Sequence, residues 1–378
     1  MIRKIADNII SPLGLTSEKN YQAVVSHNSA LSFYEDAFGL PEPCFVSLLD
    51  RQVVSTAFNG LGGTSSYSFF EKLCILSISR ALINAAIDSQ RTDVVFVLST
   101  TKGNVDSLAI NLESEAGYIG VSAEKIAGFF GNPNKPIVTS NACISGVCAQ
   151  IAAIRLLLAG EYKYAVVVGA DVLSRFIISG FQSFKALSYE NCKPYDKDRI
   201  GLNLGEAAGT MILERVDKVD SDDWIYVGSS IHNDANHISG PSRTGEGSFR
   251  VLVDILKSIR KEEIAFINAH GTATVYNDEM ESIAIHRAEL EEIPVNGLKG
   301  FYGHTLGAAG VIETILSMQA IDNKVILPTR GYETSGTTYH LNLSNSVRKT
   351  EKQGFIKILS GFGGSNAGIA YKKGGYND

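Results

Sequence analysis

The chain has 378 residues, with 34 Lys and Arg against 40 Asp and Glu, a net charge of −6 and 44% hydrophobic residues. This length provides two or three domains' worth of chain and a large core, which excludes a disordered protein. Mild acidity without a run of basic residues gives no electrostatic footprint for nucleic acid or for an anionic membrane. We therefore expect neither as a partner.

The opening segment and the cysteines favour a reducing compartment. The segment MIRKIADNIISPLG interrupts its apolar residues with Asp7 and Asn8, unlike a secretory signal. The longest apolar neighbourhood, residues 151–160, contains Arg155 and is shorter than the roughly 18 residues of a membrane span. The five cysteines are an odd number and include no CxxC pair. We expect a cytoplasmic protein with reduced thiols, no membrane span and no metal site.

Short β-branched runs recur along the chain and predict strands that are covered on both faces. In chain order they are Val94–Leu98, Pro136–Thr139, Ala165–Val168, Thr210–Leu213, Ile264–Ile267 and Phe355–Leu359. An amphipathic helical stripe over residues 249–259 and a weaker one over 312–319 lie between strands. This alternation predicts an α/β protein built around buried sheets.

The acidic stretch DKVDSDD, residues 217–223, interrupts this pattern a little past the middle of the chain. We expect it to join two halves, 1–216 and 217–378. Strands in both halves end in small-residue or Gly-rich loops, NACISG in the first and NAHGTAT and SGFGGSNAG in the second. These loops suggest a duplicated architecture, although no repeat at a fixed period supports it.

Cys143 is the first candidate for chemistry. A strand runs into it within PIVTSNACISGVCAQIAAIRLLL, and a long apolar helix follows. A cysteine at a strand-to-helix turn lies near free helix N–H groups, which can stabilise a thiolate nucleophile. Since Cys is among the most buried residue types, this segment alone also fits a structural cysteine.

Three further segments carry candidate site residues. His270 leaves a strand into a loop with the hydroxyls of Thr272 and Thr274, where it could meet a ligand. His304 lies in KGFYGHTLGAAG, whose small residues allow another backbone to approach and which contains neither nucleotide-binding glycine pattern. The turn SGFGGSNAG around Phe362 offers backbone N–H groups suited to an oxyanion hole. Each segment alone also fits a structural histidine or an ordinary turn.

In order, residue type and local spacing, these four segments together resemble the β-ketoacyl-acyl carrier protein synthases, of the elongating Cys-His-His class in the thiolase superfamily. The similarity extends to ADNIISPLGLTSEKNYQAV and KPYDKDRIGLNLGEAAGTMILE, and so covers essentially the whole chain. It implies a thiolase fold in which duplicated αβαβα halves form a five-layer sandwich. The first half would carry the nucleophilic cysteine and the second the two histidines.

The resemblance implies a role for each matched residue. Cys143 would hold an acyl group, while His270 and His304 would stabilise the enolate formed as a malonyl thioester loses CO2. The backbone N–H groups of Cys143 and Phe362 would form the oxyanion hole, and Phe362 would also gate the acyl pocket. The remaining matches are Lys299 with its acid partner Glu281, Thr272 and Thr274 at the pantetheine, Phe181 lining the acyl pocket, and Lys185 docking the carrier.

The implied activity is that of a 3-oxoacyl-[acyl-carrier-protein] synthase in fatty-acid or polyketide-type biosynthesis. The resemblance implies a homodimer and no cofactor, because acyl carrier protein brings its substrates on phosphopantetheine. Two alternatives stay open: a ketosynthase/chain-length-factor heterodimer that needs its partner, and a cysteine hydrolase using Cys143 with one histidine. Ile200, Val275, Phe301 and Tyr302 depart from the family's usual residues, and the last two could narrow the pocket.

Overall fold

Within the described residues, the strands of the largest sheet form two groups of five with the same internal order. The first half contributes β1 (Ile2–Ile10), β4 (Val94–Ser99), β5 (Ile137–Thr139), β6 (Tyr164–Asp171) and β8 (Ala207–Arg215). The second half contributes β9 (Trp224–Asn233), β10 (Ile264–Asn268), β11 (Val295–Asn296), β14 (Gly354–Gly361) and β15 (Ser365–Lys373). The computed structural model describes residues 1–40, 42–64, 66–110, 114–234 and 236–374, and joins these strands in the order β11-β10-β14-β15-β9-β1-β8-β6-β4-β5.

This order shows the duplication that the sequence only suggested. From each outer edge to the centre, both halves run through their third, second, fourth, fifth and first strands. The halves meet where β1 pairs with β9, with Arg3 opposite Ile225. The six β-branched runs all form strands, as predicted, although β5 at the sheet edge is only partly buried. The expected boundary at 216/217 falls between β8 and β9.

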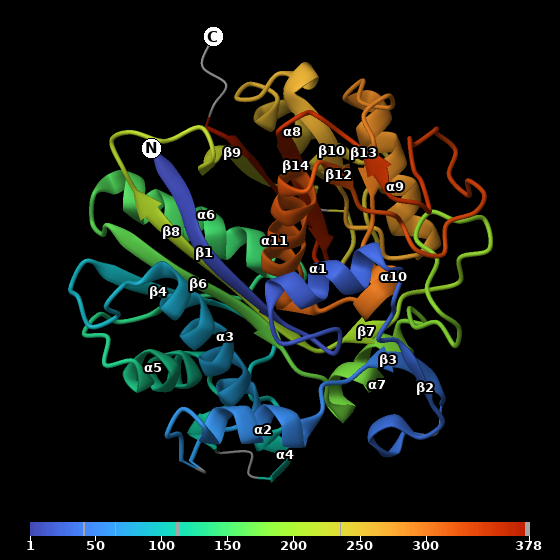
Figure 1. Cartoon of the computed structure of the whole chain (residues 1–378). Coiled ribbons are helices and arrows are strands. Elements are labelled where there is room, and N and C mark those ends of the chain that lie inside the picture. Colours follow the sequence, from blue (N-terminus) through green and yellow to red (C-terminus); the bar gives the residue numbers. More distant parts are fainter. Residues whose placement is uncertain (41, 65, 111–113, 235, 375–378) are drawn as a thin grey trace.

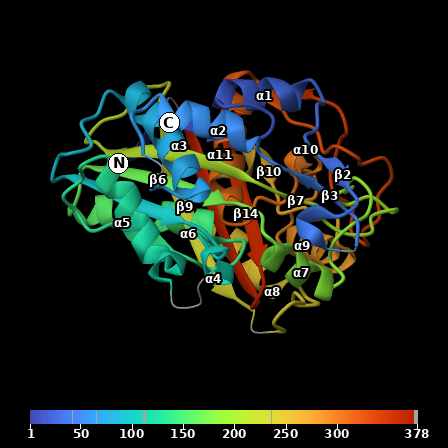
Figure 2. The same ribbon diagram turned by 90° about the horizontal axis from the view of Figure 1, so that it is seen from below.

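Helices complete five layers (Figure 1). The five strands of each half act as one sheet layer. Outside the first sheet lie α3 (Phe69–Ala85) and α5 (Ile119–Phe129), and outside the second lie α8 (Glu246–Ile255) and α9 (Val275–Arg287). The central layer between them holds α6 (Ser145–Ala159) and α11 (Ala309–Asp322). The two central helices contact strands of both halves, whereas α3 packs on β1 and β8, and α8 on β9 and β15. Figure 2 shows α5 and α9 on opposite flanks of the molecule. The duplicated thiolase-type sandwich expected from the sequence is therefore present.

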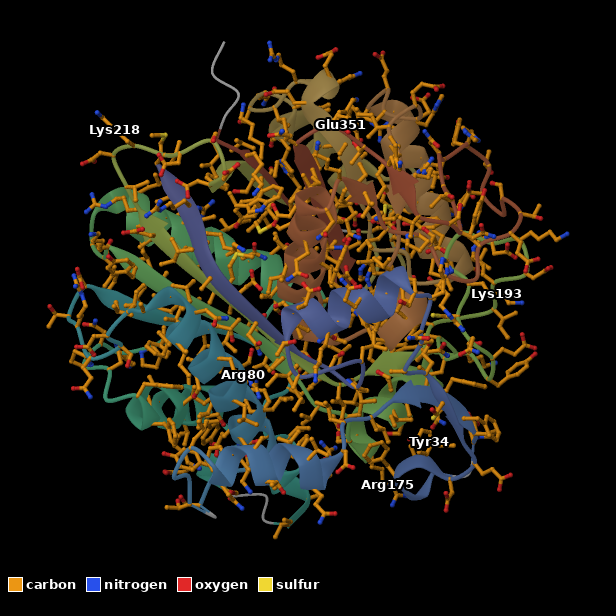
Figure 3. All side chains as sticks on the ribbon, viewed as in Figure 1. Tyr34, Arg80, Arg175, Lys193, Lys218 and Glu351 are labelled. Carbon is orange, nitrogen blue, oxygen red and sulfur yellow. The ribbon has the colours of Figure 1, made fainter. Side chains whose placement is uncertain are left out.

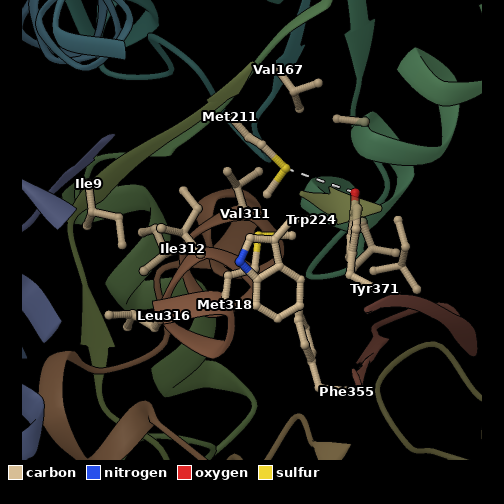
Figure 4. Close-up of a cluster of buried hydrophobic side chains, with 14 of the residues drawn as sticks. Ile9, Val167, Met211, Trp224, Val311, Ile312, Leu316, Met318, Phe355 and Tyr371 are labelled. Atoms are coloured by element: carbon tan, nitrogen blue, oxygen red, sulfur yellow. Dashed lines mark hydrogen bonds between the residues drawn. The ribbon is translucent and has the colours of Figure 1, made fainter. Parts of the chain in front are cut away.

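The central layer carries the largest core cluster. Val311, Ile312 and Leu316 of α11 pack against side chains from strands of both halves, including Met211 and Phe355 (Figure 4). Because α11 is buried on nearly every side, it has no polar face, which explains its weak helical stripe in the sequence. Two sheets thus share one apolar layer, and the loops at its edge become neighbours.

The helix expected over residues 249–259 ends early. α8 stops at Ile255, and the N–H of Leu256 caps it by donating to the carbonyl of Leu252. Ile259 remains buried in the same cluster as Ile255 although it lies beyond the helix. The apolar stripe therefore predicted burial correctly and helix length wrongly, because the chain turns there to enter β10.

The remaining helices and strands within the described residues are short. They are α1 (Ser17–Val25), β2 (Ser32–Tyr34), β3 (Cys44–Ser47), α2 (Arg51–Asn59), α4 (Ser107–Ile110), α7 (Arg175–Ser183), β7 (Leu204–Gly205), α10 (Lys299–Tyr302), β12 (Val325–Ile326) and β13 (Arg348–Lys349), with four 3-10 turns at Ala37–Gly39, Glu115–Gly117, Lys261–Glu263 and Leu306–Ala308. Long polar side chains such as Lys218 and Glu351 extend outward from the ribbon (Figure 3).

One segment has the length and hydropathy of a membrane-crossing helix. Within the ranges described above, only Ala142–Ala159 passes that test, and 67% of it is buried inside the protein. It contains α6, whose place between the two sheets accounts for its apolar composition. The five cysteines are all free, as expected for reduced thiols.

Candidate active site

Cys143 lies in the turn between β5 and α6, where the sequence placed it. The preceding residue, Ala142, has a φ of 44°, a left-handed conformation that a residue with a Cβ adopts only with support. The hydroxyl of Ser145 provides it, accepting a hydrogen bond from the N–H of Asn141 at 2.7 Å and donating to the Ala142 carbonyl at 2.6 Å. The braced turn holds Cys143 just ahead of the helix, where it lines a cavity.

The structure brings Cys143, His270 and His304 together. The Cys143 Sγ and a ring nitrogen of each histidine all lie within 4.8 Å of one another. The two imidazole centroids are 5.0 Å apart, with the rings at 84°. All three side chains are buried, and one thiol and two imidazoles from three separate loops therefore face a common point.

Small residues after His304 allow this approach. A Cβ on Gly146 would lie only 2.9 Å from the carbonyl oxygen of Gly307 and from the Cα of Gly310. The buried carboxylate of Asp171 accepts the Gly307 N–H at 2.7 Å and so fixes the same loop. The close backbone contact expected around His304 is confirmed, and it presses the start of α11 against the Cys143 turn.

Both histidines are neutral at pH 7. Burial, followed by the nearby ammonium of Lys299, lowers the pKa of His270 and of His304 well below its usual value. Leu306 donates its N–H to Nδ1 of His304 at 3.3 Å, which leaves the ring proton on Nε2. Nε2 of His304 is buried without a hydrogen-bond partner in the described chain, and so is Nδ1 of His270. His304 therefore offers an N–H donor to a ligand.

Burial works against the thiolate expected at Cys143. Burial raises the pKa of the Cys143 thiol to about 11, and the opposing effects of Lys299, Lys102 and its own backbone N–H do not offset it. Removing a thiolate from water therefore opposes the stabilisation predicted from the helix N-terminus. We expect Cys143 to lose its proton during the reaction.

Alkylation of Cys143 should reveal this high pKa. Because the thiolate is the nucleophile, we expect the rate with iodoacetamide to rise about tenfold per pH unit from pH 7 to pH 10. Peptide mass spectrometry separates Cys143 from the other cysteines. A rate that levels off below pH 9 would show a thiolate stabilised in advance.

The expected ion pair between Lys299 and Glu281 is wrong. The Lys299 Nζ instead donates to Glu313 Oε1 at 3.0 Å and to the His270 carbonyl. Glu281 accepts the N–H of His270 at 2.6 Å and the N–H of Gly271 at 2.9 Å. Both carboxylates are buried, but Glu281 projects from α9 to the amide side of the loop, whereas Glu313 comes from the central α11.

A second acid on α9 holds the next part of this loop. Asp278 accepts the N–H of Thr272 at 3.0 Å and the N–H of Tyr195 at 2.7 Å. Burial, with repulsion from Glu281 next, raises the pKa of Asp278 to about 7. The hydroxyls of Thr272 and Thr274, 2.9 Å apart, line the cavity. The two acids of α9 thus position the loop from His270 to the threonines.

The cavity that begins at Cys143 has a volume of about 840 Å³ and an aromatic wall. Phe362 stacks on Phe181 with ring centroids 5.7 Å apart and meets Phe184 edge-on at 5.2 Å. The exposed Lys185 lies among the lining residues. A Cβ on Gly361 would lie 3.2 Å from the Cys143 nitrogen, which puts the loop carrying Phe362 directly against the Cys143 turn.

Of the four residues that depart from the family's usual residues, two line the cavity and two lie in the core. Ile200 and Val275 are exposed and line the cavity. Phe301 and Tyr302 are buried in the largest core cluster and do not belong to the lining within the described residues. The possibility that these two aromatic side chains narrow the pocket is therefore not realised.

Sequence reasoning missed three buried charged residues, Glu313, Asp278 and Lys357. Glu313 interrupts the apolar run AAGVIETIL, and Lys357 interrupts FIKIL. A single charge in an otherwise buried element needs a partner and is a signal for such a cluster. Asp278 offered no comparable signal because α9 is polar along much of its length.

Two family profiles match this chain. Residues 68–218 match "Beta-ketoacyl synthase, N-terminal domain" and residues 225–333 match "Beta-ketoacyl synthase, C-terminal domain", which together cover more than half of the chain. The 3-oxoacyl-[acyl-carrier-protein] synthase 2 of Vibrio harveyi is 31% identical over 97% of this chain and 96% of its own length. The synthase 2 of Rhizobium meliloti is 34% identical, but the match covers 64% of this chain and only 61% of that relative.

Solved structures share the fold at lower identity. A ketosynthase from Xenorhabdus doucetiae, in complex with its chain length factor, matches with a TM-score of 0.85, 23% identity and 98% of both chains covered. A β-ketoacyl synthase from Burkholderia phymatum matches with a TM-score of 0.85, 20% identity and coverage of 98% and 99%. With both halves matched in sequence and the fold shared, this chain belongs to the β-ketoacyl synthase family of acyl-transferring condensing enzymes.

Proposed function

We propose that this chain is an elongating 3-oxoacyl-[acyl-carrier-protein] synthase of the KAS I/II-like subtype, working in fatty-acid or polyketide-type biosynthesis. The observation that carries the proposal is the convergence of one thiol and two neutral imidazoles within 4.8 Å at a cavity of about 840 Å³. A cysteine hydrolase would use one histidine as a base, and a second buried imidazole held beside it has no task in that reaction.

The first step loads Cys143. Its sulfur attacks the acyl thioester carbonyl, the new C–S bond forms, the bond to the carrier sulfur breaks, and the Cys143 proton leaves with the carrier thiol. Because the pKa of Cys143 is high, proton loss accompanies bond formation. The N–H groups of Cys143 and Phe362 would stabilise the tetrahedral oxyanion, and the contact of Gly361 with the Cys143 nitrogen supports this assignment.

The second step makes the carbon–carbon bond. The malonyl carboxylate leaves as CO2, its bonding electrons form an enolate, and N–H groups of His270 and His304 donate to the enolate oxygen. The α-carbon then attacks the acyl carbonyl on Cys143, the C–S bond breaks, and the released thiolate takes up one proton. Neutral imidazoles suit this task because they stabilise the developing charge without protonating the carbon.

Substrate delivery needs no metal or organic cofactor in this scheme. The phosphopantetheine of an acyl carrier protein would pass the hydroxyls of Thr272 and Thr274, which line the cavity. Lys185 and the aromatic side chains of Phe181 and Phe184 also line this cavity. Carrier proteins of this class are acidic, so the exposed Lys185 would favour docking there. The free cysteines support a cytoplasmic location.

Intact-protein mass spectrometry tests the proposal. The purified chain is mixed with a series of acyl carrier proteins and then with malonyl carrier protein, beside the variant Cys143→Ala. We expect acyl mass on the wild type only, discharged by the malonyl carrier as a 3-oxoacyl product. Acylation followed by simple hydrolysis, or acylation of the Cys143→Ala variant, would contradict the proposed function.

We propose two possible assemblies for the active protein, a homodimer and a heterodimer. The edge strand β5 leads directly into the Cys143 turn, and its outer edge could continue the sheet into a second copy, which favours a homodimer. The chain-length-factor complexes among the structural neighbours favour a heterodimer instead. Light scattering combined with the condensation assay separates them, since an active dimer of one chain excludes a required partner.

A further inference from the structure

Lys357 places a second ammonium beside the Lys299–Glu313 pair. It lies in the middle of β14 with its side chain 0% exposed. Since β14 runs parallel to β10, Lys357 lies opposite Asn268, two residues before His270. A buried ammonium is strongly unfavourable unless it is paired and hydrogen-bonded, so a lysine at this position needs a reason.

The contacts of Lys357 supply that reason. Its Nζ donates to Oε2 of Glu313 and, at 3.2 Å, to the Ala269 carbonyl. Lys299 makes the matching pair of contacts with Oε1 of Glu313 and the His270 carbonyl. One carboxylate therefore bridges two ammoniums, and each ammonium holds one of two consecutive carbonyls in the loop that presents His270.

The opposite side of the same loop is also held. Glu281 accepts the N–H groups of His270 and Gly271, so carbonyls and amides are each bound to charged groups. Both lysines add positive charge near the imidazoles: after burial and Lys299, Lys357 further lowers the pKa of His304. Removing the Lys357 ammonium would free the Ala269 carbonyl and one Glu313 oxygen, and the carboxylate could then turn away from Lys299.

We propose that Lys357 is a positioning residue that acts with Lys299 to hold His270 for the decarboxylation step. This inference rests on the proposed function, because it assigns a task within that reaction. Lys357 is given no contact with substrate. Its effect should therefore fall on the half-reaction that needs the histidines and leave loading of Cys143 almost unchanged.

The variant Lys357→Met removes the charge and keeps an unbranched side chain. We expect malonyl decarboxylation and condensation to fall about 100-fold, the usual result of a misplaced catalytic group. Acylation of Cys143, followed by intact mass, should stay within about threefold of the wild type. Lys372→Met is the matched control. Lys372 lies on the adjoining strand β15 and pairs with Glu263, and its replacement should leave both rates unchanged.

The wild-type pH profile provides a measurement that does not depend on a folded variant. Burial lowers the pKa of Lys357 to about 8. The carboxylate of Glu313 opposes this shift, the ammonium of Lys299 adds to it, and the carboxylate of Glu281 opposes it more weakly. Raising the pH from 7 to 9 removes its proton, so decarboxylation should fall while acylation of Cys143 rises. In Lys357→Met the fall in decarboxylation should be absent.

Each outcome decides the matter. Parallel loss of acylation and decarboxylation in Lys357→Met, or no loss of either, would overturn the positioning role. If that variant does not fold, a wild-type decarboxylation rate that holds steady up to pH 9 overturns it equally. Wild-type protein that acylates without condensing would instead remove the proposed function, and this inference with it.

Discussion

Replacing His304 with alanine is expected to abolish condensation while Cys143 still accepts an acyl group. The neutral His304 N–H is one of two donors to the enolate oxygen in the proposed mechanism, and loss of one such donor typically costs about 100-fold to 1,000-fold in rate. Loading depends instead on the thiol and the backbone N–H groups beside it. Intact mass measures loading, and release of CO2 from malonyl carrier protein measures decarboxylation.

A matched variant of an exposed histidine serves as the control for any unspecific effect of replacing histidine with alanine. His340 is exposed, and His340→Ala should leave loading and CO2 release at wild-type rates. Retention of CO2 release by His304→Ala would remove the enolate role from His304. Loss of loading in the same variant would mean that the imidazole acts on Cys143 instead.

Replacing Glu313 with alanine is expected to lower the free energy of unfolding by about 3 to 5 kcal/mol, the usual cost of breaking a buried ion pair from one side. The Glu313 carboxylate is 0% exposed and is the shared partner of Lys299 and Lys357. Its removal leaves two buried ammoniums without a compensating charge. Urea unfolding followed by circular dichroism measures the change.

An exposed ion pair provides the control for Glu313→Ala. Glu351 contacts Lys324 at 3.1 Å, with their side chains 82% and 70% exposed. Water screens such a pair, and Glu351→Ala should change the unfolding free energy by less than about 1 kcal/mol. Equal effects of the two substitutions would show that the buried cluster does not stabilise the fold.

The sequence predicted the strands well because their signal is local. Near-continuous β-branched runs such as Val94–Leu98 indicate strands covered on both faces. All six runs form strands, and all but the edge strand β5 are largely buried. The amphipathic pattern of α11 was weak in the sequence, because a helix that is buried on nearly every side has no polar face. The small-residue and Gly-rich loops only suggested the duplication, since it lies in strand order and not in residue identity.

The sequence by itself determined the α/β class, the turn that carries Cys143, and the segments that carry His270 and His304. Local chain chemistry settles these features, because apolar periodicity sets strands and small residues set turns. Only the tertiary structure decided that Lys299 pairs with Glu313, that Lys357 joins them, and that burial raises the pKa of the Cys143 thiol. These depend on which side chains distant elements bring into one water-free space, and on how strongly burial there disfavours charge.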